Sequence, residues 1–414
     1  MRGQPLNINF RHLFWIMAEV VALAIAGVFG SVLFVRVAGA DFYGQYLYVF
    51  SLSVLGSLIM LPGFNSALVN SAANNTHGDF ATVLRFKLRF YPGYVAFFFF
   101  VSLLMYFFGK GKDISLGFLL VGVIGGWQYV INGYSSYFVG IKDYTTSFWW
   151  NLLLALSVPV GAISYLIVHK SGYIPLSVAL IVAVTLLWQS LVQLAQYFHV
   201  NRLLANNVGS SGLKKYSINL SFMSLLGGAQ SHLDQFVVGL FLNYSALTYY
   251  SLAKRVFGAL SSVFYGLQKY IQPRLAGSDW ASAKKYFRQY LQTYAVIVPG
   301  LIAVYLLLPY FFEWVYGAEY ILSAEYAQLL VLVILLDFPN FYIESYLRAR
   351  QSYRDMWIGR VISFVMLLAL IPLVKYWGVW GVITCRVITS FIVSSVMLYI
   401  FYSPGDRELQ VVRT

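Results

Sequence analysis

The sequence predicts an all-α polytopic membrane protein with about twelve transmembrane helices, arranged as two pseudo-symmetric six-helix lobes around a central cavity. Of the 414 residues, 60% are hydrophobic and only 10% are charged, whereas a soluble protein keeps roughly a quarter of its residues charged. Apolar stretches of about 20 residues, the length that crosses a bilayer as a helix, recur along the whole chain. Water cannot solvate this much apolar surface with so few charges, so lipid is expected to cover it.

The apolar stretches fall into two groups of similar length along the chain. The first group is expected to form helices near 12–36, 43–66, 88–109, 114–138, 145–168 and 173–198. The second group is expected near 217–242, 246–272, 291–312, 324–349, 357–376 and 378–402. Only short polar connections separate these stretches, so almost nothing remains for a soluble domain.

A repeated motif suggests that the two groups form related lobes. The sequence DFAT at 79–82 follows the second predicted span, and DWAS at 279–282 follows the eighth. Repeats that keep the same orientation are related by an axis along the membrane normal. The predicted organisation is an N-terminal six-helix lobe at 1–200, a cytoplasmic inter-lobe linker at 201–216, a C-terminal six-helix lobe at 217–402 and a cytoplasmic tail at 403–414.

The basic residues predict the orientation of the chain. The formal net charge is +13, and most Lys and Arg residues fall in connections on the side that both termini share. Cytoplasmic loops carry this excess of basic residues, so both termini are predicted to be cytoplasmic. Because the basic residues are spread between apolar spans, no nucleic-acid partner is expected.

Ionisable side chains inside the predicted spans are candidates for function, because a charge at mid-membrane costs several kcal/mol. Asp234 and Arg255 lie about ten residues on either side of a turn near 243–245, so an antiparallel hairpin would bring them level. We interpret this pair either as an anion-binding patch with an acidic partner or as a structural ion pair. Lys254 points about 100° away from Arg255 around the helix, so the two cations cannot both face Asp234. The cation that does not face Asp234 is expected to line a cavity.

Other deep charges lie in the first span and in the last three. Arg386 is near the middle of the last span, and Asp337 is near the middle of the tenth. Asp337 is expected either to pair with Arg386 or to carry a coupling proton. Glu19 is similarly deep in the first span, and for both acids a simple buried carboxyl group is the alternative. Glu344 and Arg360 flank a predicted turn and are interpreted as a structural pair.

Cations inside a membrane suit a cargo that carries phosphate. A diphosphate group is prohibitively costly in hydrocarbon, and Lys and Arg side chains in a water-filled cavity would offset that cost. Tyr249 and Tyr250 are candidates for a sugar-binding wall, because a tyrosine ring stacks on apolar sugar faces and its hydroxyl bonds to sugar hydroxyls. Ordinary packing is the alternative for both tyrosines.

Several motifs of other protein classes are missing from the sequence. It contains no Walker A, H-E-x-x-H or G-x-S-x-G motif, so neither an ATP motor nor these hydrolase sites are indicated. The single cysteine, Cys385, cannot form a multi-cysteine zinc site. The sequence therefore favours a secondary transporter over an enzyme. No metal or cofactor is expected apart from a coupling proton or sodium ion.

Four stretches carry a resemblance to a known family: GADFYGQY at 39–46, LPGF at 61–64, DQFVVG at 234–239 and YYSLAKR at 249–255. With these, the chain resembles the Wzx-type polysaccharide flippases of the multidrug/oligosaccharidyl-lipid/polysaccharide exporter superfamily. The resemblance implies translocation of undecaprenyl-pyrophosphate-linked repeat units from the cytoplasmic to the periplasmic leaflet, for O-antigen, capsule or exopolysaccharide assembly. It also implies a membrane-lipid environment and partnership with a polymerase and a chain-length regulator.

The resemblance further implies a V-shaped pair of lobes around a cationic cavity, and ion-gradient coupling without an ATPase. The residues assigned to that cavity on this basis are Lys254, Arg255, Arg386, Arg36 and Arg360. The residues assigned to ion coupling are Asp234, Glu19 and Asp337.

Two other functions remain open at this point. A multidrug or cation antiporter of the same superfamily would favour an acidic cavity, and the deep Lys and Arg residues argue against it. A membrane-embedded polysaccharide polymerase or glycosyltransferase would carry a large loop outside the membrane, and no predicted connection is long enough.

Overall fold

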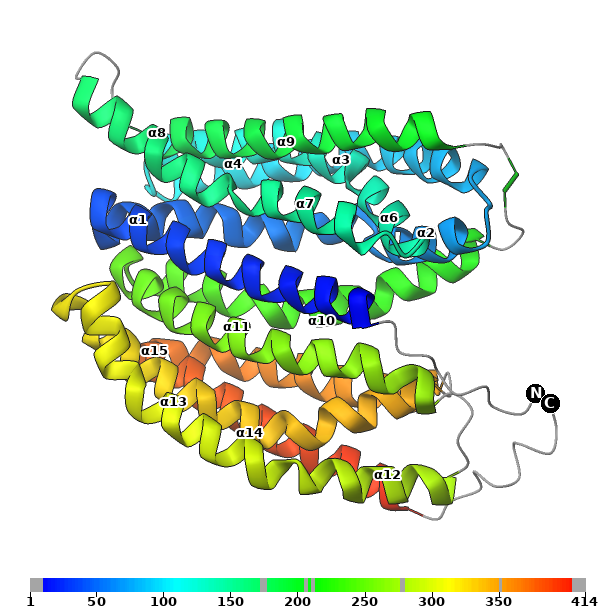
Figure 1. Cartoon of the computed structure of the whole chain (residues 1–414). Coiled ribbons are helices and arrows are strands. Elements are labelled where there is room, and N and C mark those ends of the chain that lie inside the picture. Colours follow the sequence, from blue (N-terminus) through cyan, green and yellow to red (C-terminus); the bar gives the residue numbers. More distant parts are fainter. Residues whose placement is uncertain are drawn as a thin grey trace.

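The computed structural model describes residues 10–171, 177–204, 208–209, 213–275, 280–349 and 352–403. Within these residues the regular structure is entirely helical, as the sequence predicts. Figure 1 shows long helices running side by side along one direction.

The helices form an N-terminal and a C-terminal group. The N-terminal group contains α1 (Phe10–Gly56), η1 (Ser57–Met60), α2 (Gly63–Ala73), α3 (Gly78–Phe107), α4 (Lys112–Leu120), the π-helical turn η2 (Val121–Gly125), α5 (Gly126–Ile131), η3 (Asn132–Ser135), α6 (Ser136–Gly140), α7 (Tyr144–Ala155), α8 (Ser157–Ser171) and α9 (Val178–Leu203). The C-terminal group contains α10 (Leu213–Phe241), α11 (Tyr244–Leu275), α12 (Trp280–Gln292), α13 (Tyr294–Val315), η4 (Ala318–Tyr320), α14 (Ile321–Ala349) and α15 (Tyr353–Tyr402).

The two longest helices each contain a glycine at which the chain reverses (Figure 1). Gly39 in α1 has φ 77° and ψ 170°, and Gly378 in α15 has φ 60° and ψ −139°. Residues with a side chain rarely adopt these conformations, so glycine allows two spans to follow each other almost without a loop. We call the end of the bundle with Gly39 and Gly378 the distal end. The opposite end, where α1 begins and α15 ends, is the proximal end.

The number of membrane spans agrees approximately with the twelve expected. Eight helices of the described residues are long and apolar enough to cross a membrane. Two of these eight, Phe14–Met60 and Asp355–Tyr402, contain the reversals and so provide two spans each. The helices α10 and α11, of 29 and 32 residues, are also long enough to cross a bilayer.

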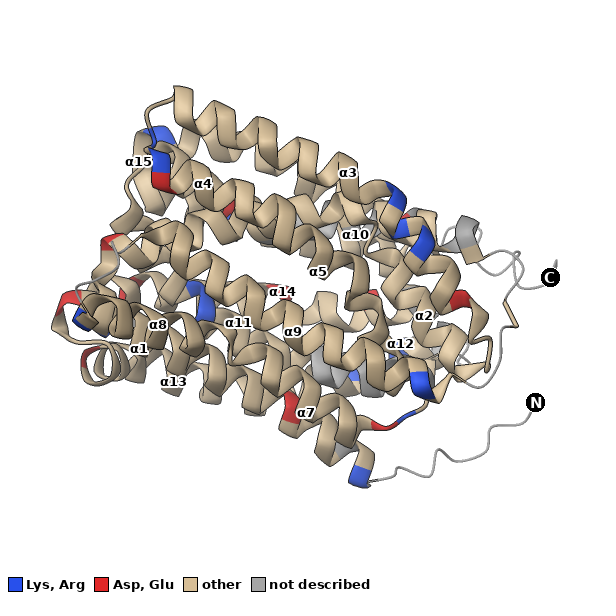
Figure 2. Cartoon of the chain, turned by 90° about the horizontal axis from the view of Figure 1, so that it is seen from above, with Lys and Arg blue, Asp and Glu red and all other residues tan. Residues whose placement is uncertain are grey.

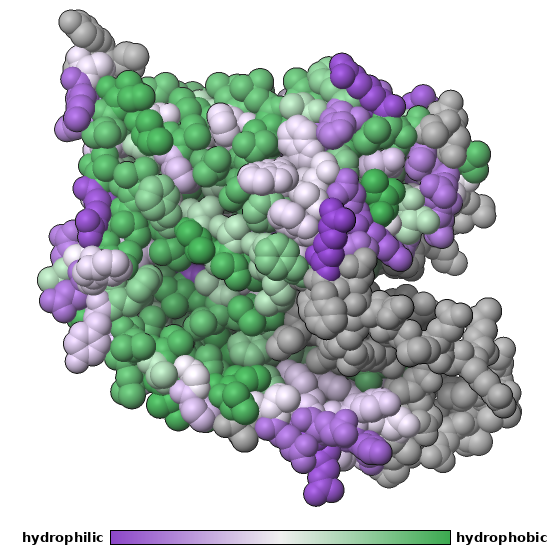
Figure 3. Space-filling model, viewed as in Figure 1, coloured by the Kyte–Doolittle hydropathy of each residue, from purple (hydrophilic) through white to green (hydrophobic). Residues whose placement is uncertain are grey.

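The surface confirms that the chain is a multi-pass membrane protein. Charged residues gather at the two ends of the bundle, and few lie along its middle (Figure 2). On the face seen in Figure 3, a broad apolar belt separates the hydrophilic residues of the two ends. Large apolar side chains within the helices are exposed, for example Phe100 of α3 at 59% and Leu306 of α13 at 60%. Lipid is the solvent that makes this exposure favourable.

The two helix groups meet along α1, α10 and α11. α1 packs against α7 and α8 on one side and against α11 on the other, while α10 packs against α2 as well as α15. The exact lobe boundaries stay predictions. Part of the predicted linker, at 205–207 and 210–212, and the predicted tail from 404 onward lie outside the described residues.

Two glycines allow the groups to approach closely. A Cβ atom on Gly44 of α1 would lie 1.9 Å from the carbonyl oxygen of Tyr244, where α11 begins at the distal end. A Cβ atom on Gly63, where α2 begins near the proximal end, would lie 2.3 Å from the backbone nitrogen of Ser221 on α10. Any larger residue would therefore push the groups apart at these two points.

Candidate functional site

A buried carboxylate on α10 holds two cations from two other helices. Lys254 of α11 donates to both oxygens of Asp234, with Nζ 2.7 Å from Oδ1 and 2.9 Å from Oδ2. Nη1 of Arg386, on α15, lies 3.4 Å from Oδ2. The Tyr250 hydroxyl donates to the same Oδ2 at 2.5 Å. We call Asp234, Tyr250, Lys254 and Arg386 the charged cluster.

The local helix geometry explains how α11 supplies two members of the charged cluster. Tyr250 and Lys254 are four residues apart, so they lie on the same face of the helix. The Lys254 Nζ atom is 5.9 Å from the centre of the Tyr250 ring. From α15, the Arg386 guanidinium carbon lies 4.8 Å from the centre of the Phe257 ring, one turn further along α11.

The charged cluster is positive and largely shielded from solvent. The side chain of Asp234 is 4% exposed, that of Lys254 15% and that of Arg386 25%. Two positive charges therefore share one negative charge. Lys254 lies about 15 Å of helix from the start of α11. A charge that is not neutralised costs free energy at that depth in a membrane. An excess of positive charge there therefore indicates a functional role, such as the binding of an anionic ligand.

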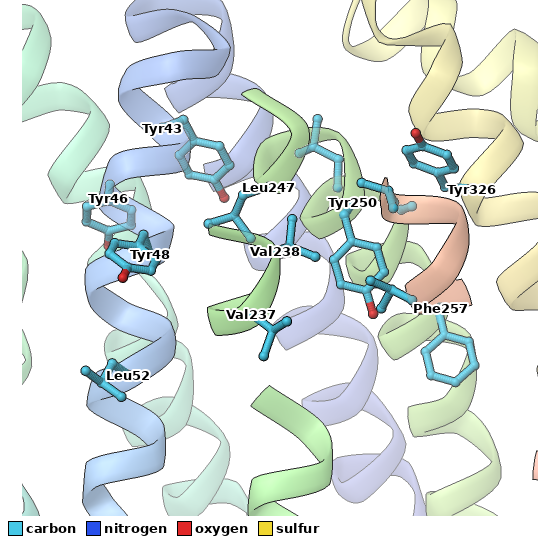
Figure 4. Packing of buried hydrophobic residues seen from close by; sticks show 14 of the residues in the cluster. Tyr43, Tyr46, Tyr48, Leu52, Val237, Val238, Leu247, Tyr250, Phe257 and Tyr326 are labelled. Carbon is cyan, nitrogen blue, oxygen red and sulfur yellow. The ribbon is translucent and has the colours of Figure 1, made fainter. Parts of the chain in front are cut away.

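The expected pair of Asp234 and Arg255 is wrong. Lys254 faces Asp234 instead, because the adjacent residue points about 100° away around the helix. Arg255 reaches across to α1, where Nη1 donates to the Gly27 carbonyl at 3.0 Å and Nη2 to the Tyr43 hydroxyl at 2.7 Å. In Figure 4, Tyr43 of α1 and Tyr250 of α11 lie on opposite sides of Leu247 and Val238.

Two adjoining cavities lie between α14 and α15, inside the C-terminal group. The first, of about 80 Å³, is lined by Asp234, Arg386 and Asp337 together with Ser363, Thr389 and Ser390. The second, of about 150 Å³, shares Asp337, Ser363 and Arg386 with the first and continues toward the proximal end. Asp337 therefore faces both cavities. Ser390 and Asn340 are hydrogen-bonding neighbours of its carboxyl group and Arg386 attracts its negative charge, but none of them forms a close ion pair with it.

The second cavity contains the pair predicted from the sequence. Arg360 forms an ion pair with Glu344, and both line the cavity wall. Asn340 lines it as well and donates to Ser394 at 2.6 Å. Its other side-chain atom, Oδ1, is buried without a hydrogen-bond partner among the described residues. A water molecule in the cavity would satisfy that acceptor.

The structure does not bring all predicted site residues together. Arg36 is exposed near the distal end and donates to the Trp314 carbonyl at 3.1 Å. Glu19 lies inside the N-terminal group, where Asn151 donates to it at 3.0 Å. Arg36 and Glu19 thus contact neither the charged cluster nor the two cavities.

The two tyrosines predicted as a sugar-binding wall differ in position. Tyr250 is completely buried and its hydroxyl binds Asp234, so a role as a sugar-facing wall is wrong for this conformation. Tyr249 is partly buried, with its ring 5.6 Å from that of Tyr320. A role for Tyr249 in sugar binding stays a prediction.

Sequence reasoning missed the polar residues that line the cavities and a buried cation elsewhere. Thr389 and Ser390 lie three and four residues after Arg386, a spacing that places small polar groups on one helix face. Lys87, expected among the flanking basic residues, is buried in the N-terminal group and donates to Asn65 at 2.6 Å and to Asn132 at 2.9 Å. A single sequence gives no signal for that burial, since a basic residue close to a span end usually faces the headgroups.

Comparison with known families decides the classification. A family model described as "Polysaccharide biosynthesis protein" matches residues 32–325, more than half of the chain. The chain belongs to this polysaccharide biosynthesis family. The family expected from the resemblance in the sequence is thereby confirmed. No curated protein sequence matches the chain significantly.

Solved structures show the fold of this family member. A structure described as "Lipid II flippase MurJ, inward closed conformation" matches with a TM-score of 0.66 and 14% identity, over 94% of this chain and 87% of that one. An outward-facing multidrug resistance MATE family transporter of the MOP superfamily matches with a TM-score of 0.68 and 14% identity, over 100% and 98%. A MOP superfamily transporter from Pyrococcus furiosus, described as having a binding pocket of reverse polarity, matches with a TM-score of 0.59 and 13% identity, over 96% and 97%. The polysaccharide biosynthesis protein therefore has the two-lobed helical fold of these transporters and flippases.

Proposed function

We propose that this polysaccharide biosynthesis protein is a flippase for undecaprenyl-pyrophosphate-linked oligosaccharides. It would move repeat units from the cytoplasmic to the periplasmic leaflet by alternating access of its two lobes, for O-antigen, capsule or exopolysaccharide assembly. The observation that supports this most is the charged cluster, in which Lys254 and Arg386 share the single carboxylate of Asp234 deep in the bundle. Arg255, the neighbour of Lys254, adds a further positive charge nearby.

This charge suits a diphosphate-linked lipid. The diphosphate group must leave one headgroup layer and enter the other, and hydrocarbon alone offers it no solvation. Ammonium and guanidinium groups held inside the protein replace part of that solvation, and guanidinium matches phosphate oxygens with two parallel hydrogen bonds. The saccharide would follow the diphosphate, with Tyr249 as a candidate contact.

The distribution of Lys and Arg supports a cytoplasmic location for the proximal end and hence for both termini. The host membrane would be the bacterial inner membrane, and membrane lipid, a polymerase and a chain-length regulator of the same pathway would be partners. Energy would come from an ion gradient, with a proton or sodium ion as the coupling ion.

Asp337 is the strongest of the three coupling candidates. It faces two polar cavities and has no ion-pair partner among the described residues by the usual distance limits. Asp234 already holds two cations, and Glu19 accepts a hydrogen bond from Asn151. An acid without a fixed counter-ion is free to exchange a proton or bind a cation as the lobes move.

A multidrug or cation antiporter is the second candidate, because the fold resembles MATE transporters as closely as the flippase. The positive charge of the cluster speaks against a cationic cargo, since like charges repel. The third candidate, a polymerase or glycosyltransferase, has less support: the similar folds are those of transporters, although a fold alone does not fix a function.

Reconstituted vesicles test the proposal. The protein is inserted into liposomes that contain a fluorescent undecaprenyl-pyrophosphate-linked oligosaccharide, and a membrane-impermeant quencher reports the fraction in the outer leaflet. We expect the lipid-linked oligosaccharide to exchange rapidly between the leaflets. The exchange should be slowed by roughly tenfold or more in Lys254→Gln and in Arg386→Gln, because each variant loses a charge-assisted hydrogen bond to the diphosphate of the cargo. Unchanged exchange in both variants, together with altered efflux of cationic dyes, would support the antiporter instead.

A further inference from the structure

Arg255 differs from the other deep cations in the partners of its hydrogen bonds. Lys254 and Arg386 contact Asp234, and Arg360 contacts Glu344. Arg255, by contrast, binds two neutral acceptors in the described structure, the Gly27 carbonyl and the Tyr43 hydroxyl. A guanidinium group is always charged, so this charge is held by neutral partners, with no ion pair to an acid among residues 10–171, 177–204, 208–209, 213–275, 280–349 and 352–403.

Both acceptors of Arg255 belong to the opposite helix group. Arg255 lies on α11, whereas Gly27 and Tyr43 lie on the two halves of α1, before and after its reversal at Gly39. A Cβ atom at position 27 would be 3.4 Å from Nη1 of Arg255, which is van der Waals contact, so the guanidinium packs directly against this part of α1. Tyr43 is completely buried and points from α1 toward α11 in Figure 4. Arg255 therefore ties both halves of α1 to α11.

Further hydrogen bonds between the groups lie toward the distal end. Thr248 of α11 donates to the Ala40 carbonyl at 2.6 Å. The Ser31 hydroxyl lies 3.0 Å from that of Tyr316, at the end of α13. These two bonds join neutral groups.

Two further cations also join the groups at this end, since Arg36 donates to the Trp314 carbonyl at 3.1 Å and Lys110 to the Leu240 carbonyl at 3.2 Å. Arg255 differs from both because it binds both halves of α1.

An anionic cargo can compete for the guanidinium. Arg255 is partly exposed, and a guanidinium has five donors, of which two are used here. A charged phosphate oxygen attracts the guanidinium as an ion of opposite charge, which a neutral carbonyl or hydroxyl oxygen does not. A diphosphate beside Arg255 would therefore draw the side chain away from Tyr43 and Gly27.

From this geometry we infer that Arg255 is a latch between the two helix groups, fastened by Tyr43 and Gly27 and released by the diphosphate of the cargo. The inference rests on the proposed function, since it requires an anionic cargo. Tyr43 is then a positioning residue, which holds Arg255 but does not touch the cargo. Release would leave the distal closure to the remaining bonds at that end, so bound cargo would shift the distal end toward its open state.

Distance measurements between spin labels test the latch. Lys170→Cys and Lys375→Cys place labels on exposed distal residues of the two groups, in a Cys385→Ser background. In liposomes without cargo, the labelled protein with Tyr43 and Arg255 unchanged should show mainly the short distance between labels that marks a closed distal end. Addition of undecaprenyl pyrophosphate should shift the distribution of label distances toward longer values. Tyr43→Phe removes one acceptor and should raise the ratio of open to closed protein roughly tenfold without cargo.

Tyr46→Phe is the matched control, because Tyr46 is also buried on α1 and stacks beside Tyr43, with ring centres 6.1 Å apart. It should leave the distribution unchanged. Arg255→Lys, which keeps the charge but loses the forked donor, should also favour the open state and provides a second variant should Tyr43→Phe fail to fold.

The outcomes separate the latch from the proposed function. If Tyr43→Phe and Arg255→Lys keep the distal-closed distribution while Arg255→Gln still slows flipping, the latch is wrong and the flippase proposal stands. If undecaprenyl pyrophosphate binds the Arg255→Gln and Lys254→Gln proteins as tightly as the unmodified protein, both proposals fail.

Discussion

Asp234 is a buried counter-ion for two cations inside the bundle. Its carboxylate is nearly inaccessible to solvent, and it accepts hydrogen bonds from Lys254, Arg386 and the Tyr250 hydroxyl. Removing one partner of a buried ion pair leaves the other charge without compensation, which costs far more than the net contribution of the pair. The residue therefore has a structural consequence in addition to any role in transport.

We expect Asp234→Asn to lower the free energy of unfolding by about 3–5 kcal/mol, because both cations lose their counter-ion. Thermal unfolding in detergent measures the effect. Tyr250→Phe, which removes only one hydrogen bond to Asp234, should cost about 1–3 kcal/mol.

A rescue variant identifies the cause of this loss. Combining Asp234→Asn with Lys254→Gln removes an unpaired charge and should restore part of the lost stability, although flipping should remain slow. If the double variant is no more stable than Asp234→Asn alone, the destabilisation does not come from uncompensated charge.

At the level of residues, the sequence identified the deep charged side chains but not how they pair. Asp234, Lys254 and Arg386 were recognisable because charges are rare in spans. The choice between Lys254 and Arg255 as the partner of Asp234 depends on the rotation of α11 about its axis. That rotation is set by packing against α1 and α14, which no local pattern in the sequence encodes.

At the level of elements, the reversals within α1 and α15 depend on single glycines. Gly39 has a φ of 77° and open space where a Cβ atom would lie, so a substitution there strains the backbone without causing a clash. We expect Gly39→Ala to cost about 1–3 kcal/mol of stability. Gly258 also has open space but lies within α11 with no positive φ, so Gly258→Ala should be neutral or stabilising by up to about 1 kcal/mol. Equal thermal stabilities of the two variants would contradict this account of the reversal.

The cavities between α14 and α15 lead to a prediction about energy coupling. Asp337→Asn removes the unpaired carboxylate, so the flipping rate should no longer respond to an imposed proton or sodium gradient. Exchange without a gradient should persist. The matched control is Glu325→Gln, an exposed acid near the start of the same helix. Flipping assays in vesicles with and without each gradient measure the effect, and a gradient response retained in Asp337→Asn would rule out this residue as the coupling group.

The sequence predicted the positions of the spans better than their internal form. One span was expected at 114–138, and the structure divides this region into α4, η2, α5, η3 and α6. Close packing is one reason: a Cβ atom on Gly122 would lie 2.8 Å from Cβ of Phe98. The buried Lys87 ammonium also binds Asn132, at the start of η3. Both causes act between helices, so hydropathy alone could not reveal them.

At the level of the whole molecule, composition was sufficient for the class and the approximate number of spans. The repeated motif at 79–82 and 279–282 indicated two related lobes. Their V-shaped arrangement came from the resemblance to a family, because apolar periodicity does not encode how helices assemble. The way the groups meet depends on close approaches at Gly44 and Gly63. A glycine inside an apolar span is common, so neither approach could be recognised without the structure.

Three deep cations, Lys254, Arg386 and Arg255, come from two helices of the C-terminal group. Lys254 and Arg386 contact Asp234, whereas Arg255 points away from it and binds the Gly27 carbonyl and the Tyr43 hydroxyl of α1. These contacts contain three positive charges and one negative charge. This imbalance is the central claim, because it distinguishes a carrier of anionic lipids from a cation antiporter with the same fold.

Binding of lipids that differ only in charge tests that claim most directly. The purified protein is titrated with undecaprenyl-pyrophosphate-linked oligosaccharide and with an uncharged lipid that carries the same oligosaccharide. We predict that the pyrophosphate form binds at least roughly tenfold more tightly, which corresponds to about 1.4 kcal/mol, and that Lys254→Gln with Arg386→Gln removes the preference. Equal affinity for the two lipids, or tighter binding of a cationic dye than of either, would contradict the account.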